Sequence, residues 1–198
     1  MVMEVALVAG SYLLGSIPFG FIITKVSKGV DIRRTGSGNI GATNVLRVVG
    51  KGAALLTFLF DLGKGLFPIV VARRIGVSEL SLAAIGLSAV LGHLYPLSLG
   101  FRGGKGVATS FGVLLGLLPK VALVLVGLWL IVAVLFRYAS LAALAVAFAA
   151  PILALGLDGR KELILLAAGL SFLLLLRHRE NVKRLLSGQE GKLGTSGR

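Results

Sequence analysis

The 198-residue sequence contains no cysteine and few acidic residues, with eight Asp and Glu against 21 Lys and Arg. The absence of cysteine excludes disulfide bonds and thiolate chemistry. The shortage of acids leaves a net charge of +13, which in a soluble protein would indicate nucleic acid as the partner. Here the basic residues lie in loops between apolar segments. Anionic lipid headgroups or a phosphorylated substrate are therefore the expected partners, and nucleic acid is not.

Hydrophobic residues make up 56% of the chain, and the mean hydropathy is +0.95. A soluble domain is usually about 45–50% apolar, and one of this size could not bury long apolar runs. The apolar segments span residues 3–24, 53–72, 79–99, 107–118, 121–136, 139–157 and 161–176. The sequence therefore predicts an all-α fold, a polytopic transmembrane bundle of about seven helices. We expect one integral membrane domain over residues 1–198, with 191–198 as a flexible tail or cloning remnant.

The distribution of basic residues predicts the orientation of this bundle. If the N-terminus is outside and all seven segments cross, 15 Lys and Arg lie in inner loops, five lie in outer loops, and Lys64 lies within a segment. The positive-inside rule favours this arrangement, which makes the C-terminus cytoplasmic. Segment 107–118 is short for a span, and Pro119-Lys120 divides it from the next, so its full crossing stays open. Glycine and other small residues at close spacing predict close helix packing.

The first polar cluster runs from Thr35 to Arg47 and reads TGSGNIGATNVLR. Its glycines free the backbone to approach a ligand, and successive N–H groups can form an anion-binding concavity. Polar side chains add donors, Arg47 offers a bidentate fork for phosphate, and a helix beginning near Ala42 would add its N-terminus. The alternative is a flexible surface loop with a helix cap.

A second cluster, FRGGKGVAT at 101–109, again joins glycines to cations at the start of an apolar segment. It lacks the spacing of a P-loop because Leu stands at position 99 and Gly at position 106, and no magnesium-binding motif follows. Nucleotide hydrolysis is therefore not expected. Just upstream, His93 lies near a membrane end, where a structural hydrogen-bonding role is the more common one.

Two further clusters place charge inside or at the end of an apolar segment. Asp61 and Lys64 stand at i, i+3 within a segment, where isolated charges cost about 2.5–3.5 kcal/mol each. They form either a structural ion pair or a pair in which Lys64 faces the polar site. Residues 177–184 end the last segment with a basic stretch typical of a membrane anchor, in which His178 and Asn181, also at i, i+3, suit a paired polar role.

In chain order, these four clusters resemble the bacterial acyl-phosphate:glycerol-3-phosphate acyltransferase family of the PlsY type. The matching stretches are SGNIGATN at 37–44 with Arg47, DLGKG at 61–65, GHLYP at 92–96 with GGKGVAT at 103–109, and RHREN at 177–181. The resemblance implies transfer of a fatty acyl group from acyl phosphate to the 1-hydroxyl of glycerol 3-phosphate. The products would be lysophosphatidic acid and inorganic phosphate, at the first step of phospholipid biosynthesis.

The resemblance further implies that no cofactor and no metal are needed, and no obligate protein partner is expected. It places the protein in the bacterial cell inner membrane, among membrane lipids, as a multi-pass enzyme. The seven-span topology puts three of the four clusters, and so the expected active site, on the cytoplasmic face. Acyl-chain preference and oligomeric state do not follow from the sequence.

The resemblance also suggests roles for individual residues. We expect the loop Ser37–Asn44 to hold the acyl-phosphate headgroup and the later basic and polar residues to hold glycerol 3-phosphate. No Ser–His–acid triad is evident, and direct transfer requires none. The hydroxyl proton would go to His178, whose imidazole suits general-base catalysis, or to a substrate phosphate oxygen. The candidate catalytic residues are Ser37, Arg47, Lys105, His178 and Asn181, and the candidate substrate-binding residues are Gly38, Asn39, Gly41, Thr43, Asn44, Lys64, Gly103 and Gly104.

A transporter or channel for a small organic phosphate is the chief alternative, because it would also need buried cations and broken helices. Such a site lies near the membrane midplane and alternates access, whereas three of the four clusters here fall at one membrane face. A scaffold that binds anionic lipid through basic loops would explain the charge but not the grouping of Gly, Asn and Ser.

Overall fold

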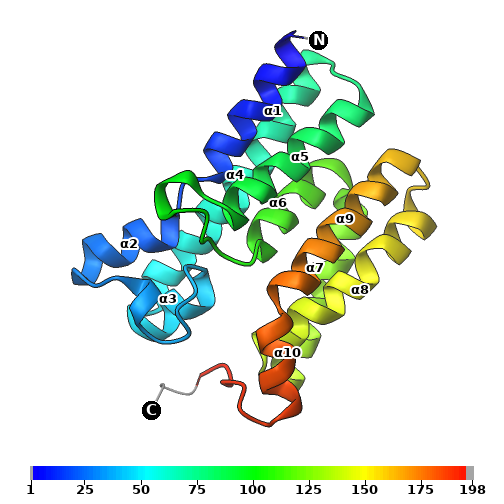
Figure 1. Ribbon diagram of the computed structural model, residues 1–198. Coiled ribbons are helices and arrows are strands. Elements are labelled where there is room, and N and C mark those ends of the chain that lie inside the picture. The colour runs from blue at the N-terminus through cyan, green and yellow to red at the C-terminus, as the bar shows by residue number, and fades with distance from the viewer. Residues whose placement is uncertain (1, 195–198) are drawn as a thin grey trace. The chain divides into compact units, whose positions relative to one another are not determined.

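The computed structural model describes residues 2–194, and within this range the secondary structure is entirely helical (Figure 1). The helices are α1 (Val2–Gly15), α2 (Phe19–Lys28), η1 (Ile32–Arg34), α3 (Ala42–Val48), α4 (Lys51–Ile75), α5 (Glu79–Leu94), η2 (Leu97–Leu99), α6 (Val107–Leu117), α7 (Pro119–Phe136), α8 (Ala139–Leu157), α9 (Lys161–Arg177) and α10 (Arg179–Leu186), where η marks a 3-10 helix. Five helical stretches of the described residues are long and apolar enough to cross a membrane, and α6 is a shorter apolar helix. The prediction of an all-α, multi-pass membrane protein is confirmed, while the number of crossings and the orientation stay predictions.

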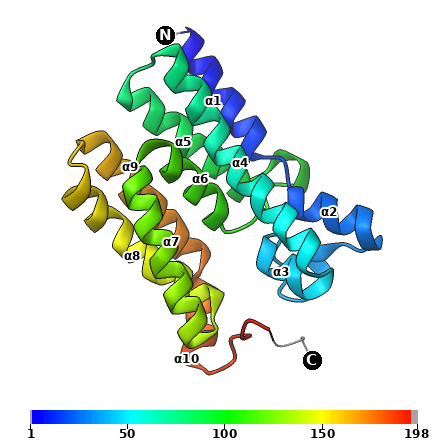
Figure 2. The ribbon, with the colours of Figure 1, turned by 180° about the vertical axis from the view of Figure 1, so that it is seen from behind.

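The described residues form two compact units, one ending at Val113 and the other beginning at Leu114. The single domain expected from the sequence stays a prediction, and each unit is described by itself. In the first unit, α1, α4 and α5 pack against one another, as the front and back views show (Figures 1 and 2).

Small residues set the spacing of the helices in the first unit. A Cβ at Gly15 of α1 would collide with the carbonyl of Ala89 in α5, and a Cβ at Gly92 of α5 would collide with the carbonyl of Tyr12. The hydroxyl of Ser88 donates a hydrogen bond to a carbonyl of α1 at 2.8 Å. The prediction that small residues allow close helix packing is confirmed here.

The first apolar segment, which we expected to form one helix, is broken into α1 and α2. Pro18 stands in the break; it lacks the N–H that would continue the helical hydrogen bonds, and its ring obstructs the preceding turn. The carbonyl of Ile17 accepts a hydrogen bond from Lys64 Nζ at 2.9 Å instead. The segment is therefore two helices rather than one, although the stretch Val2–Lys28 as a whole is still long and apolar enough to cross a membrane. The second piece, α2, carries exposed Ile22 and Val26 beside basic residues.

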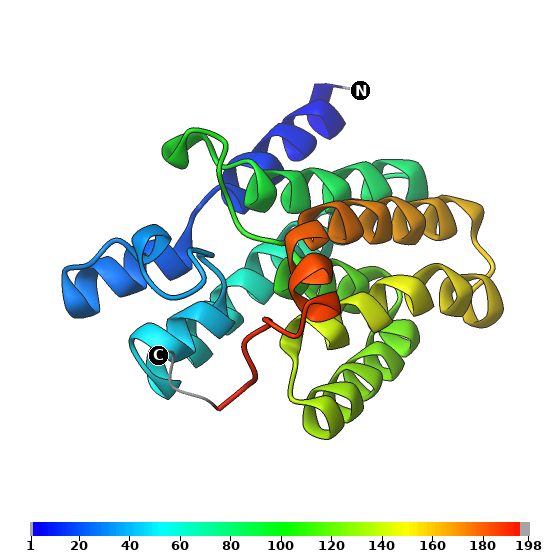
Figure 3. The ribbon, with the colours of Figure 1, turned by 60° about the horizontal axis from the view of Figure 1, so that its bottom comes forward.

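In the second unit, α8 packs against both α7 and α9, and α8 and α9 run antiparallel with a short turn between them (Figure 3). The buried residues of this unit are mostly small on α8, for example Ala143, and larger on α9, for example Leu166. α7 begins at Pro119, which confirms the predicted division of the chain at this point. The described part of the predicted tail reaches the start of α8, where the Leu193 N–H donates to the Arg137 carbonyl at 2.6 Å. Residues 195–198 lie outside the described residues.

Candidate active site

The loop between η1 and α3 takes its shape from one buried side chain, that of Asn44. Its Nδ2 donates to the carbonyls of Thr35 at 3.0 Å and Asn39 at 2.8 Å, with a longer contact of 3.4 Å to Ile32. Its Oδ1 accepts a hydrogen bond from the backbone N–H of Ser37 at 2.9 Å. Asn44 therefore organises the loop from within, and its contact with substrate stays a prediction.

Glycines in this loop adopt conformations that other residues rarely take. Gly36 has φ of 59° and Gly38 has φ of 71°, both in the left-handed region, so the expected freedom of the backbone is used at these two positions. Gly41 has φ of −78° and directly precedes α3, which begins at Ala42 as predicted. Ser37, between the two left-handed glycines, is exposed.

The second polar loop connects α5 to α6 and is closed at its base by main-chain hydrogen bonds. The N–H of Gly103 donates to the carbonyl of Leu94 at 3.0 Å, and the N–H of Gly104 donates to the carbonyl of His93 at 3.1 Å. A Cβ at either glycine would collide with these same residues, so the close approach requires glycine at both positions. Lys105 follows directly, is half-buried and lies two residues before α6 begins at Val107.

The two polar loops share one apolar cluster. Leu99 of η2, in the second loop, is buried with Ile32, Ile40 and Val45, which flank and terminate the first loop. The fold therefore brings together two stretches about sixty residues apart in the chain. Arg47 lies in the last turn of α3, on the short helix that follows the first loop, and Thr43 lies one turn before it.

The predicted ion pair within the membrane is present. Lys64 Nζ lies 2.8 Å from Asp61 Oδ1, and both side chains are buried. His93 Nδ1 lies 3.6 Å from the same oxygen. Lys64 therefore points to Asp61 and to the carbonyl of Ile17, which matches the structural alternative, and its contact with substrate stays a prediction.

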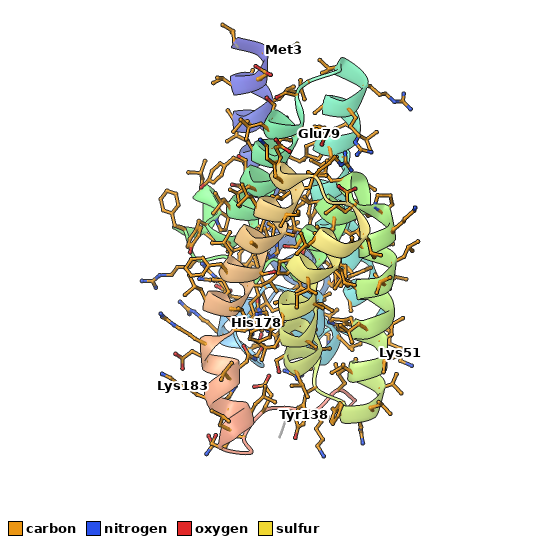
Figure 4. All side chains as sticks on the ribbon, turned by 90° about the vertical axis from the view of Figure 1, so that its right-hand side faces the viewer. Met3, Lys51, Glu79, Tyr138, His178 and Lys183 are labelled. Atoms are coloured by element: carbon orange, nitrogen blue, oxygen red, sulfur yellow. The ribbon has the colours of Figure 1, made fainter. Side chains whose placement is uncertain are left out.

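The remaining candidate residues lie in the second unit, where α9 ends and α10 begins (Figure 4). His178 and Asn181 are both buried. His178 Nδ1 is 2.8 Å from the carbonyl of Leu174. A carbonyl only accepts, so Nδ1 carries a proton in both the neutral and the charged ring, and it is only in the neutral ring that Nε2 has a lone pair. Lys183, farther along α10, points outward, in agreement with its interpretation as part of a basic anchor.

Sequence reasoning missed Glu190, which holds Asn181 in place. Its Oε1 accepts hydrogen bonds from Asn181 Nδ2 at 2.6 Å and Ser140 Oγ at 2.7 Å, and its Oε2 accepts from Arg184 Nε at 2.7 Å. Burial raises the pKa of this carboxyl, but the hydrogen bonds from the three donors outweigh it and hold the pKa below its usual range. Acidic residues are rare in this basic stretch of the chain, and a single glutamate there was the signal that could have revealed it.

Leu99 was missed as well, because a single apolar residue in a loop gives no sign of its distant partners.

Among the described residues, no group of three or more His, Cys, Asp or Glu side chains is placed to hold a metal ion. The arrangement offers hydrogen-bond donors and cations that suit phosphate groups.

Comparison with known proteins places the chain in a biochemical context. The family model for glycerol-3-phosphate acyltransferase matches residues 5–188. A glycerol-3-phosphate acyltransferase of Thioalkalivibrio sulfidiphilus is 46% identical over 194 residues, which cover 98% of this chain and 96% of the relative.

Two solved structures of PlsY (YgiH), an integral membrane glycerol 3-phosphate acyltransferase, share the fold. The glycerol 3-phosphate form superimposes with a TM-score of 0.93 at 43% identity, and the lysophosphatidic acid form with a TM-score of 0.90 at 42% identity. Each comparison covers 98% of this chain and 96% of the other.

Proposed function

This chain belongs to the glycerol-3-phosphate acyltransferase family, and we propose that it uses acyl phosphate as the donor and the 1-hydroxyl of glycerol 3-phosphate as the acceptor. The products are lysophosphatidic acid and inorganic phosphate. The observation that carries the proposal is the shared apolar cluster around Leu99, which assembles two glycine-rich loops with N–H groups and cations suited to phosphate. Solved relatives with glycerol 3-phosphate and lysophosphatidic acid support the acceptor and the product.

Acyl phosphate is a mixed anhydride, so phosphate is already a good leaving group. The hydroxyl oxygen attacks the acyl carbonyl carbon, the bond from that carbon to the phosphate oxygen breaks, and the hydroxyl proton leaves for an acceptor. The protein must hold two phosphates close together and stabilise the developing negative charge, tasks for which positioned N–H groups and cations suffice. We assign the headgroup of acyl phosphate to the loop Ser37–Asn44.

We assign glycerol 3-phosphate to Arg47, Lys105, His178 and Asn181. The proton acceptor is either His178 Nε2 or a phosphate oxygen of the substrate. The hydrogen bond from His178 Nδ1 to the Leu174 carbonyl supports the first choice, because it leaves Nε2 with the lone pair in the neutral ring. A rate that falls as His178 protonates in wild type, but not in His178→Gln with residual activity, would identify Nε2 as the acceptor.

We further propose that the chain crosses the bacterial inner membrane seven times, with the active site on the cytoplasmic face. The excess of basic residues in the loops assigned to the inside supports this orientation. The chain has no cysteine, so single cysteines can be introduced for labelling without background. Ser187→Cys should react with an impermeant thiol reagent in inside-out vesicles and Gly159→Cys in right-side-out vesicles; the reverse pattern would refute the orientation.

The reaction is tested with purified full-length protein, acyl phosphate, glycerol 3-phosphate and EDTA. We expect lysophosphatidic acid and phosphate to form in equal amounts. Arg47→Ala should lower kcat/KM for glycerol 3-phosphate at least about hundredfold because a charge-assisted phosphate contact is lost. Arg34→Ala removes an exposed arginine from the neighbouring η1 and serves as the matched control. A folded wild-type protein that forms no product in EDTA would refute metal-free acyl transfer from acyl phosphate.

A further inference from the structure

A buried chain of polar side chains leads from α4 to the second glycine loop. Oδ1 of Asp61 lies 2.8 Å from Lys64 Nζ and 3.6 Å from His93 Nδ1, and none of the three side chains is more than 4% exposed. Lys64 also donates to the carbonyl of Ile17, in the break between α1 and α2. Asp61 is thus held from one side and contacts the His93 ring with the other.

The opposite edge of the His93 ring lies against the second loop. A Cβ at Gly104 would collide with His93 Nε2, so the ring and the loop backbone are in direct contact. The N–H of Gly104 also donates to the His93 carbonyl at 3.1 Å. Because Lys105 is the next residue, any shift or rotation of the ring moves the backbone from which the lysine extends.

We propose that His93, oriented by Asp61, is a positioning residue for glycerol 3-phosphate: it sets the backbone of Gly103 and Gly104 and thereby places Lys105 for the substrate phosphate. This inference rests on the proposed function, in which Lys105 contacts that phosphate. His93 does not touch the reacting atoms. Its Nδ1 edge faces the carboxylate that orients the ring, and its Nε2 edge supports the loop.

A gain in stability does not readily explain why Asp61, Lys64 and His93 are buried together within a membrane protein. Desolvation of each buried ion costs several kcal/mol, and replacing a buried pair by apolar residues is often neutral or stabilising. Placement is a stronger reason, because a displacement of about 1 Å at a binding group can lower a rate about hundredfold. The contacts at His93 meet this need because they lie between a fixed carboxylate and the residue directly before Lys105.

Two substitutions at His93 distinguish the role of the Nδ1 edge of the ring from that of the Nε2 edge. The amide nitrogen of His93→Asn falls near the position of Nδ1 and leaves the loop unsupported, whereas that of His93→Gln falls near the position of Nε2 and retains part of the support. Ser88→Ala is the matched control, since Ser88 is also a buried polar residue of α5 but bonds to a carbonyl of α1. KM for each substrate, kcat and the thermal midpoint are measured on the purified full-length variants.

We expect His93→Asn to raise KM for glycerol 3-phosphate about tenfold and His93→Gln about threefold, with KM for acyl phosphate changed by less than about twofold. Ser88→Ala should lower the thermal midpoint without changing either KM. Unchanged KM values in both His93 variants, or an equal rise for both substrates, would overturn the positioning role. Wild-type protein that forms no lysophosphatidic acid would instead overturn the proposed function, and the two failures are thereby distinguished.

Discussion

The two regions that hold the candidate site residues are stabilised by different chemistry. In the first unit, the glycine loops are held by the neutral amide of Asn44, by backbone hydrogen bonds at Gly103 and Gly104, and by the apolar cluster around Leu99. In the second unit, Asn181 is held by a carboxylate, that of Glu190. Neutral amides do not titrate and carboxylates do, so we expect the loop around Asn44 to respond to changes of shape and the region around Asn181 to respond to changes of charge.

The largest effect should follow removal of the amide that organises the first loop. Asn44→Ala deletes the acceptor for the Ser37 N–H and the donor for three carbonyls, which should cost about 2–4 kcal/mol of unfolding free energy. We expect activity to fall about hundredfold, because the loop loses the shape that presents its N–H groups. Thermal unfolding in detergent and lysophosphatidic acid formation measure the two effects.

Leu46→Ala provides a control on the same helix, since Leu46 is an exposed residue of α3. Its activity should stay close to that of wild type. An Asn44→Ala protein with wild-type stability and activity would show that the loop is held by other contacts, and the contrast between the two regions would then lose its basis.

A smaller effect is expected from adding one methyl group to the second loop. The Cβ of Gly104→Ala would meet the buried His93 ring, and such overpacking typically costs about 1–3 kcal/mol. We expect kcat/KM for glycerol 3-phosphate to fall about tenfold as Lys105 is displaced. Gly52→Ala in α4 is the matched control, because a Cβ there has nothing within 4 Å and should be neutral to slightly stabilising.

If both glycine variants behave alike, the loop accommodates a side chain and its shape is not the sensitive feature.

Features encoded locally were predictable from the sequence. The long apolar runs, the start of α7 at Pro119 and the start of α3 at Ala42 depend on neighbours in the chain, and the structure has them as expected. The grouping of Asp61 with Lys64 followed from their i, i+3 spacing. Pro18, which separates α1 from α2, is also a local signal, but the break was not predicted.

Features that depend on tertiary contacts were not predictable. The direction of the Lys64 side chain follows from the carbonyl left accessible at the break after α1, and the place of Leu99 follows from a cluster whose other members lie more than forty residues away in the chain. The organising role of Asn44 likewise depends on how the preceding loop folds back over α3. Composition could indicate polar groups but not which of them shape the loop.

The smallest effect, and the one that best tests the contrast, concerns Glu190. Glu190→Gln keeps a side-chain oxygen for Ser140 and Asn181 but loses the ion pair with Arg184, so we expect a loss of about 0.5–1 kcal/mol for this half-exposed pair. The only tryptophan, Trp129, lies in α7 of the second unit, so its fluorescence reports unfolding there.

The contribution of Glu190 to the free energy of unfolding should depend on pH. Because the pKa of Glu190 is lowered below 4.5 in the folded protein, its stabilisation is complete above that pH and is lost as the pH falls through the lowered folded value. In this acidic range, the free energy of unfolding followed by Trp129 fluorescence should therefore fall more in wild type than in Glu190→Gln. Glu180→Gln removes an exposed carboxylate paired with Lys183 and is the control. Its free energy of unfolding should change with pH at the same slope as that of wild type. Identical slopes in wild type and Glu190→Gln would mean that Asn181, like the loop around Asn44, is held by contacts that do not titrate.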